Sequence, residues 1–143
     1  MNKTIIREGK INLGKWFIID ATDKNLGRLA SETAKTLVGK YDPLYAPNVN
    51  PKNIIVIINA DKIRVTGNKK FDKFYYRHSG QVGGLTIETF NELQSRLPGR
   101  ILEKAVKGIL PKGPLGRELF NNLKVYAGSS HPHEAQNPVA LVM

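Results

Sequence analysis

The chain has 143 residues, 41% hydrophobic and 24% charged, a composition typical of one globular domain. It contains no cysteine, which excludes disulfides, zinc ribbons, iron–sulfur clusters and a cysteine nucleophile. The 22 Lys and Arg residues against 12 Asp and Glu give a net charge of +10, which predicts a polyanionic partner. The longest apolar run, 54–58, is too short to span a bilayer, so we expect no membrane partner.

The first half of the chain is predicted to form a strand, a helix, a loop and a second strand. Residues 16–20 are an aromatic and β-branched run typical of a buried strand. Apolar side chains then recur at helical spacing over 26–38, and Gly39 suits the position just after a helix. Residues 41–53 contain three prolines and predict a loop. The uninterrupted apolar run 54–58 predicts a central strand that is covered on both faces, as in parallel sheets.

The second half combines short strand-like runs, glycine-rich loops and helices. Residues 63–65 and 71–76 resemble short strands, the second with charged flanks that make it exposed or loop-like. The segment 79–84 contains three glycines and predicts a loop, after which we expect Thr86 to cap a helix ending near residue 96. Further along, the pattern predicts helices over 98–109 and about 115–123, a last strand over 124–127 and an extended polar tail over 128–143.

This order of elements predicts a single α/β domain over residues 1–143. We expect residues 1–15 to be an N-terminal extension and residues 128–143 to be an extended C-terminal tail. A mostly parallel sheet covered by helices is the favoured architecture, because strands and amphipathic helices alternate along the first part of the chain.

The strand at 16–20 and the helix after it resemble half of a dinucleotide-binding unit. Only Gly27 is present where that fingerprint has three glycines, and no lysine follows a glycine-rich loop as in a P-loop. We therefore predict no nucleotide cofactor. His131 and His133 could supply two metal ligands, but no spacing nominates a third, so we also predict no metal site.

Two aspartates, Asp20 and Asp61, follow predicted strands, where nuclease carboxylates often lie. Because the chain is strongly basic and has few acids, the favoured interpretation is that both residues cap local structure. The alternative function is a small RNA- or nucleotide-processing α/β enzyme with Asp20, Asp61 and His78 as its active site. That alternative requires the three side chains to meet in one pocket.

Cations and aromatic residues alternate between Arg64 and His78, a pattern typical of nucleic-acid-binding surfaces. Cations neutralise phosphates, and exposed rings stack on bases. Phe71 and Phe74 either take part in such stacking or face the core, and the sequence leaves both interpretations open. The predicted nucleic-acid contacts in this stretch are Arg64, Lys69, Lys70, Lys73, Arg77 and His78.

Two glycine-rich segments, 77–84 and 107–117, also lie among cations. Glycine lets backbone N–H groups approach an anion because no Cβ intervenes, and Pro111 and Pro114 stiffen the second segment. We predict a phosphate backbone as the ligand of both. The predicted contacts here and at the end of the chain are Gly80, Gly83, Gly84, Lys107, Lys112, Gly113, Arg117, Lys124, His131 and His133.

The second glycine-rich segment carries a resemblance to a known family. The run 106–117, continued by 123–128, closely resembles the signature of the L-thirteen family of large-subunit ribosomal proteins. Matching stretches occur in the same order along nearly the whole chain, at 16–20, 26–30, 59–62, 65–69, 75–84, 131–133 and 135–136.

This resemblance implies a structural constituent of the large ribosomal subunit that binds large-subunit rRNA, has no catalytic activity or small-molecule substrate, and joins the particle early in assembly. Neighbouring ribosomal proteins are further implied partners, and mRNA is one if the protein also acts as a translational regulator. The implied fold is a three-layer α/β/α domain with a mainly parallel, four-stranded sheet. Residues 88–98 and 131–133 are most similar to cyanobacterial and plastid forms, so the expected location is a ribosome in a plastid stroma or bacterial cytoplasm.

Overall fold

The computed structural model describes residues 14–43 and 45–141. None of the helices in these ranges is long and apolar enough to cross a membrane. The elements in chain order are β1 (Trp16–Asp20), α1 (Leu26–Val38), β2 (Ile54–Ile58), a 3-10 helix (Ala60–Lys62), α2 (Lys69–Asp72), β3 (Phe74–His78), β4 (Leu85–Thr89), α3 (Phe90–Arg96), α4 (Pro98–Ile109), α5 (Pro114–Asn121), β5 (Leu123–Val125), a second 3-10 helix (Glu134–Gln136) and β6 (Val139–Ala140).

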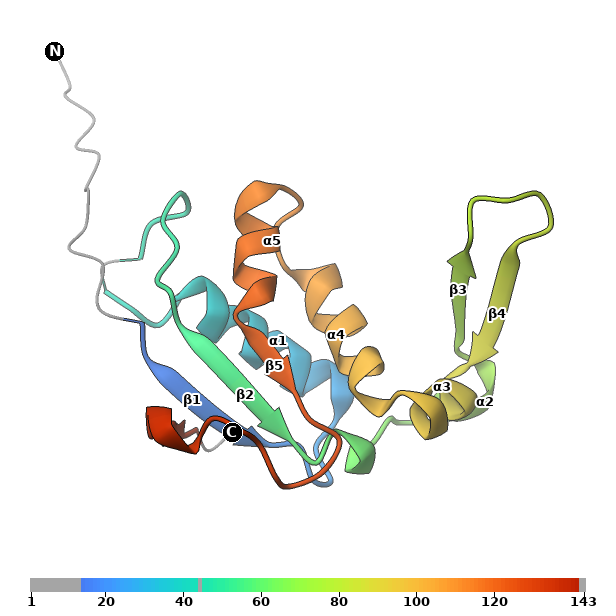
Figure 1. The fold of residues 1–143 in the computed structure, drawn as a ribbon, viewed down its shortest axis with the longest axis horizontal. Helices are drawn as coiled ribbons and strands as arrows, with labels where there is room; N and C mark the ends of the chain where they lie inside the picture. Colours follow the sequence, from blue (N-terminus) through green and yellow to red (C-terminus); the bar gives the residue numbers. More distant parts are fainter. Residues whose placement is uncertain (1–13, 44, 142–143) are drawn as a thin grey trace, which may run out of the picture.

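The body of the protein is a four-stranded sheet with the strand order β5-β2-β1-β6, in which every pairing is parallel. Figure 1 shows β5, β2 and β1 side by side. Successive side chains of a strand point to opposite faces. On β2, Ile55 and Ile57 therefore join the main hydrophobic core, while Val56 points to the other face and is also fully buried. This burial on both faces explains why the sequence of β2 is apolar at every position.

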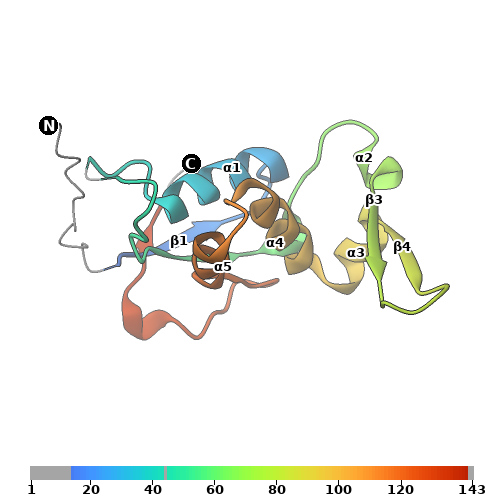
Figure 2. The ribbon, with the colours of Figure 1, turned by 90° about the horizontal axis from the view of Figure 1, so that it is seen from above.

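Helices α1, α4 and α5 pack together over one face of the sheet. Figure 2 shows α1 and α4 on the same side of β1 and β2. The side chain of Asn25 caps α1 by accepting a hydrogen bond from the backbone N–H of Gly27. Gly39 ends the helix with φ at 79°, in the left-handed region that glycine enters without strain. The cap thus fixes where α1 begins. The apolar stripe of α4 buries one side of that helix against the core and leaves its other side exposed.

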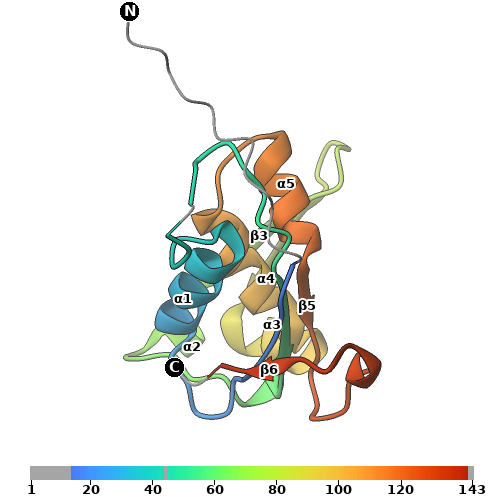
Figure 3. The same ribbon diagram turned by 90° about the vertical axis from the view of Figure 1, so that its left-hand side faces the viewer.

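The other face of the sheet is covered by the C-terminal segment (Figure 3). The ring of His133 lies 5.2 Å from the ring of Trp16 on β1, and its Nε2 is 2.8 Å from the hydroxyl of Tyr126. Residues 139–140 then add β6 to the edge of the sheet, beside β1. The α/β class and the parallel four-stranded sheet are confirmed, but the layer on this face is an irregular segment with one 3-10 turn rather than a layer of α-helices.

These contacts predict that His133 holds the C-terminal segment on the sheet. We expect His133→Ala to change the fluorescence of Trp16, the single tryptophan, and to speed amide hydrogen exchange across 128–138. Exchange in β2 should stay unchanged, because its backbone pairs with β1 and β5. Equal exchange in 128–138 for the variant and the native chain would contradict this role.

Strands β3 and β4 form a separate antiparallel hairpin, which we call the arm. The arm projects from the end of the molecule where α2 and α3 lie (Figures 1 and 2). It contacts these two helices, and Phe90, at the start of α3, is fully buried where they meet the body. The arm therefore presents two exposed faces and two open strand edges.

Several expectations for this region were wrong. The helix expected from Thr86 begins at Phe90, with Thr89 as its N-cap, and residues 85–89 instead form β4. The strand expected over 71–76 is the end of α2 followed by β3. Residues 63–65 form no strand, since Arg64 makes a single parallel bridge to Asn25. The strands at 16–20 and 54–58 and the helices at 26–38 and 98–109 are confirmed.

Candidate nucleic-acid interface

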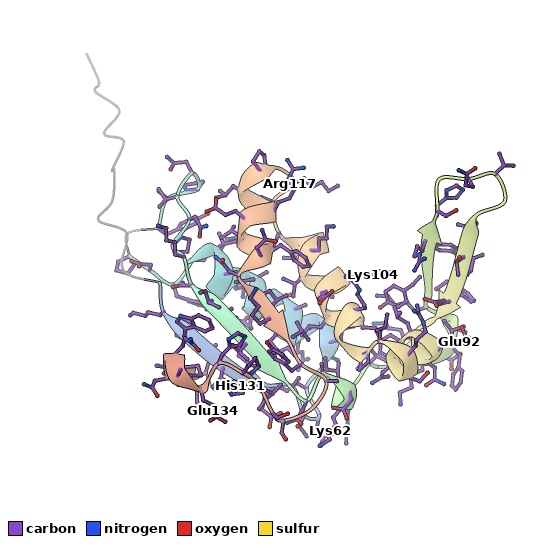
Figure 4. All side chains as sticks on the ribbon, in the orientation of Figure 1. Lys62, Glu92, Lys104, Arg117, His131 and Glu134 are labelled. Atoms are coloured by element: carbon purple, nitrogen blue, oxygen red, sulfur yellow. The ribbon has the colours of Figure 1, made fainter. Side chains whose placement is uncertain are left out.

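A ring on the arm brings together lysines from two distant parts of the chain. Tyr75 packs on Phe90, with ring centroids 6.5 Å apart. The Nζ of Lys73 lies 5.5 Å from the centroid of the Tyr75 ring, and the Nζ of Lys104 on α4 lies 4.9 Å from it. Figure 4 shows Lys104 pointing from α4 toward the arm. The half-buried Tyr75 thus holds one cation from the arm and one from α4 near the same ring, and its burial raises the pKa of its hydroxyl.

Further cations extend from this junction along the exposed side of α4. Lys107 follows Lys104 by almost one turn, and its Nζ lies 5.7 Å from the ring centroid of Phe120 on α5. Arg117 lies one turn before Phe120, and Arg77 shares a face of β3 with Tyr75. We call this group the α4–arm surface. Its cations are Lys73, Arg77, Lys104, Lys107, Lys112 and Arg117.

The charge of the α4–arm surface is not neutralised by the protein. All six cations are exposed, and within 14–43 and 45–141 none of them forms an ion pair with a carboxylate. Other cations do form such pairs, including Arg96 with Glu88 and Arg100 with Glu103. Since unpaired cations on one surface attract a polyanion most strongly, this surface is the best candidate for binding a nucleic acid backbone.

The first glycine-rich segment forms the tip of the arm. Gly80 and Gly83 have φ values of 93° and 75°, in the left-handed region that favours glycine. A Cβ on Gly84 would lie 2.0 Å from Oγ of Ser79, and the Ser79 N–H donates to the Gly84 carbonyl across the turn. Nδ1 of His78 accepts from the Gly80 N–H. The geometry of the hairpin therefore explains why glycine occupies these positions, and contact of these glycines with RNA stays a prediction.

The second glycine-rich segment joins α4 to α5. Gly113 has an extended backbone that any residue can adopt, and a Cβ there would meet nothing within 4 Å. Gly116 is different, because its Cβ would lie 1.8 Å from the carbonyl oxygen of Pro111. Packing of the chain therefore requires glycine at 116 but not at 113, which leaves room beside Gly113 for a ligand backbone.

The remaining predicted contacts lie elsewhere. Arg64 lies beside the start of α1 and is paired with Asp23 at 2.7 Å. Lys124 points to the face of the sheet opposite Leu123, away from the helices. His131 and His133 lie within the C-terminal segment, where the backbone N–H of His133 donates to Nδ1 of His131. Lys69 and Lys70 are exposed on α2 at the base of the arm. The sequence did not single out Lys104, because only the packing of α4 against the arm reveals it.

Comparison with known proteins identifies the family of this chain. The model of the family described as ribosomal protein L13 matches residues 14–132, which is most of the chain. The chain belongs to the ribosomal protein L13 family. It is 62% identical over 126 residues to the large ribosomal subunit protein uL13 of Laribacter hongkongensis, covering 88% of this chain and 89% of that protein. It is 55% identical over 143 residues to the uL13 protein of Crocosphaera subtropica, covering 100% of this chain and 95% of that protein.

The L13-family match agrees with the resemblance found in the sequence, and the matches are of the bacterial type. A third relative, the uL13 protein of Methylobacillus flagellatus, is 60% identical over 128 residues, which cover 90% of this chain and 88% of that protein. The matched residues include the arm, α4 and α5. The family assignment therefore applies to the same part of the chain that carries the α4–arm surface.

The enzyme alternative requires Asp20, Asp61 and His78 to meet, and in this L13-family fold they do not. Asp20 ends β1 and Asp61 lies in the first 3-10 helix, whereas His78 lies at the far end of β3 in the arm (Figure 1). In the described part of the chain no three His, Asp or Glu side chains are grouped as metal ligands would be. The structure therefore does not assemble the active site that the alternative needs.

Asp20 instead organises the loops after β1 and β2. Its Oδ1 accepts hydrogen bonds from Nδ2 of Asn59 at 2.9 Å, from the Thr22 N–H at 3.0 Å and from the Thr22 hydroxyl at 2.7 Å. The bond from Asn59 and the two from Thr22 lower the pKa of Asp20 to about 2. This carboxylate is consequently ionised at neutral pH and engaged in local structure, as the capping interpretation predicts.

The lowered pKa of Asp20 gives a pH dependence of stability. A carboxyl whose folded pKa lies below its unfolded value stabilises the fold above the unfolded value, and this contribution is lost as pH falls through the folded pKa. Because Asp20 is exposed, we expect a contribution of only about 1 kcal/mol after solvent screening. Between pH 5 and pH 2, the free energy of unfolding should fall less steeply for Asp20→Asn than for the native chain. Chemical denaturation at a series of pH values measures both slopes, and parallel slopes would contradict the prediction.

Proposed function

We propose that this protein is a structural constituent of the large ribosomal subunit and that it binds large-subunit rRNA through the α4–arm surface. The observation that carries the proposal is the set of six exposed cations on that surface without ion-pair partners in the described chain. Membership in a ribosomal protein family and the net charge of +10 support the same partner.

Binding should rest on phosphate neutralisation and on shape rather than on the reading of base edges. Lys73 and Lys104 are held against the Tyr75 ring, so they lose less side-chain freedom when they contact a phosphate than free lysines would. Beside Gly113 a sugar–phosphate backbone can approach the chain closely. Contacts of this kind position a protein on folded RNA and are strongly weakened by salt.

The proposal includes a role in early subunit assembly and in translation, with rRNA and neighbouring ribosomal proteins as partners and a structural rather than catalytic function. A translational regulator would also bind a discrete mRNA site that survives competition with rRNA, and this activity stays a prediction. A plastid location likewise stays a prediction, based on the similarity of 88–98 and 131–133 to plastid forms.

The experiment that tests the proposal is sedimentation of the native protein from a lysate at low magnesium, before and after a high-salt wash. We expect the protein in the large-subunit fraction, in a stoichiometric amount, both before and after the wash. Charge contacts enclosed within an assembled subunit are screened by salt much less than the same contacts on isolated rRNA. A protein found only in the soluble fraction would contradict the proposal.

A further inference from the structure

The arm has a second face, which is apolar and which the rRNA proposal does not use. In the β3–β4 register, Tyr76 lies opposite Ile87, and Phe74 and Leu85 flank this pair on the same face. The exposed ring of His78, opposite Leu85, is the polar end of this face at the tip of the arm. The exposed fractions of Phe74, Tyr76, Leu85 and Ile87 are 49%, 62%, 54% and 52%. About half of the surface of each of these large side chains thus remains in contact with solvent. We call this group the apolar arm face.

The apolar arm face points away from the body. Side chains alternate along β3, so Tyr75 and Arg77 occupy the other face, where Tyr75 meets Phe90 and Lys104. On β4, Glu88 also belongs to that inner face and pairs with Arg96 on α3. The arm therefore separates its side chains into one face with charges and one face without Lys, Arg, Asp or Glu.

This separation of charge identifies the class of partner. An RNA backbone placed on the apolar arm face would meet no Lys or Arg there to neutralise its phosphates. The rings of Phe74 and Tyr76 could stack on bases, but Leu85 and Ile87 beside them offer no ring, so a base-stacking platform would cover only part of the face. Desolvated phosphates facing aliphatic groups would lower affinity. An uncharged apolar protein surface suits this face, because burial of both partners is favourable and leaves no charge unpaired. Exposed patches of this kind on monomers commonly mark protein contacts.

We propose that the apolar arm face docks on an apolar surface of a neighbouring protein in the large subunit, while the opposite face of the arm meets rRNA. The inference rests on the proposed location in the subunit, but it does not depend on any single RNA contact of the α4–arm surface. It gives the arm two partners of different chemistry, one on each face of a two-stranded sheet.

The size of the apolar arm face argues for a neighbour within the particle rather than a second copy of this chain. Four half-exposed large side chains offer on the order of 400 Å², if each fully exposed one contributes about 150–250 Å². A stable free complex needs about 800 Å² from each partner. The contact is therefore too small to hold a dimer in solution, but it is large enough to add to RNA contacts that already hold both proteins in one particle.

Photocrosslinking from adjacent positions of β4 tests the proposal. Ile87 and Thr86 are both exposed and point to opposite faces of the arm, so they form a matched pair. Benzoylphenylalanine is placed at either position in the full chain, and salt-washed large subunits are irradiated. We expect position 87 to give an adduct with one protein of the large subunit, identified by mass spectrometry, and position 86 not to give that adduct.

Other outcomes would overturn the proposal. These are an adduct from position 87 to RNA or to a second copy of this chain, the same protein adduct from both positions, or no adduct from position 87 in subunits that contain the protein. Absence of the protein from the large-subunit fraction is seen before irradiation and would refute the proposed function instead, so the two failures are distinguishable.

A second measurement uses the double variant Tyr76→Ser with Ile87→Ser. Both side chains are about half exposed, so the free protein should stay folded, with only the loss of one cross-strand pair of the arm, and should bind isolated rRNA equally well. Its release from large subunits in a salt wash should be roughly tenfold faster or more, because its contact with the neighbour is lost. Thr86→Ala is the control and should leave release unchanged. Release of the double variant at the native rate would overturn the proposal.

Discussion

Gly116→Ala is expected to destabilise the protein by about 2–3 kcal/mol, the cost of overpacking a closed site. The new Cβ would lie 1.8 Å from the carbonyl oxygen of Pro111 and 2.8 Å from its carbonyl carbon, and both atoms are backbone. In an open helix, alanine would instead stabilise the fold by about 1 kcal/mol over glycine. The steric term dominates because the α4–α5 connection must move away from α5 before the methyl group fits. Urea unfolding of both proteins measures the difference.

Gly113→Ala is the matched control. It makes the same substitution three residues earlier, where the backbone is extended and a Cβ would meet nothing within 4 Å. The free energy of unfolding should change by no more than about 0.5 kcal/mol. Its affinity for large-subunit rRNA should nevertheless fall, if the ligand backbone approaches at this glycine. Equal stability losses in the two variants would mean that the packing of Gly116 against Pro111 is not what requires glycine.

The parts of the fold that the sequence predicted are those whose signals are local. The helix at 26–38 has an apolar stripe and ends at Gly39, and the strand at 54–58 is apolar throughout because both of its faces are buried. Neither signal depends on a distant part of the chain. The two-residue strand β6 has no local signal, since it exists only where 139–140 happens to reach the edge of β1.

The helix cap predicted at Thr86 lies three residues before the N-cap in the structure, Thr89. The helix begins after Thr89, whose hydroxyl accepts from the Glu92 N–H while the Glu92 carboxylate accepts from the Thr89 N–H. This capping box is visible in the sequence as Thr89 followed three residues later by Glu92, whereas Thr86 has no acidic residue at that spacing. The hydrogen bond that the Glu92 carboxylate accepts from the Thr89 N–H, together with a smaller effect of the Thr89 side chain, lowers the pKa of Glu92. Alternation over 85–89 after a glycine-rich loop is the corresponding signal for a hairpin.

The candidate site was predictable in composition but not in arrangement. Cations near 73–77 and 107–117 stand out in the sequence, and ring contacts on the arm and on α5 connect the two groups across α4. Lys104 joins the two groups through the ring of Tyr75, a contact between residues far apart in sequence. The sequence also left open whether Phe71 and Phe74 face the core, and the structure shows both of them exposed. Only the β3–β4 register shows which side chains share the charged face of the arm and which share the apolar face.

Removal of four cations from the α4–arm surface is expected to have the largest effect on RNA binding. Each lost phosphate contact should lower the slope of log K against log salt by about 0.7–0.9, so four should lower it by about 3. Affinity for large-subunit rRNA near physiological salt should fall on the order of a hundredfold. Filter binding at several salt concentrations measures both quantities. The substitutions are Lys73→Ala, Lys104→Ala, Lys107→Ala and Arg117→Ala.

A control with the same change in net charge separates this surface from the general field of a basic protein. It removes four exposed cations that lie outside the α4–arm surface, with the substitutions Lys15→Ala, Arg28→Ala, Lys40→Ala and Lys62→Ala. If rRNA binds the α4–arm surface, the control should keep most of the salt slope and lose far less affinity, because distant charges act only through a screened field. Equal losses in the two variants would show that net charge, and not this surface, determines binding.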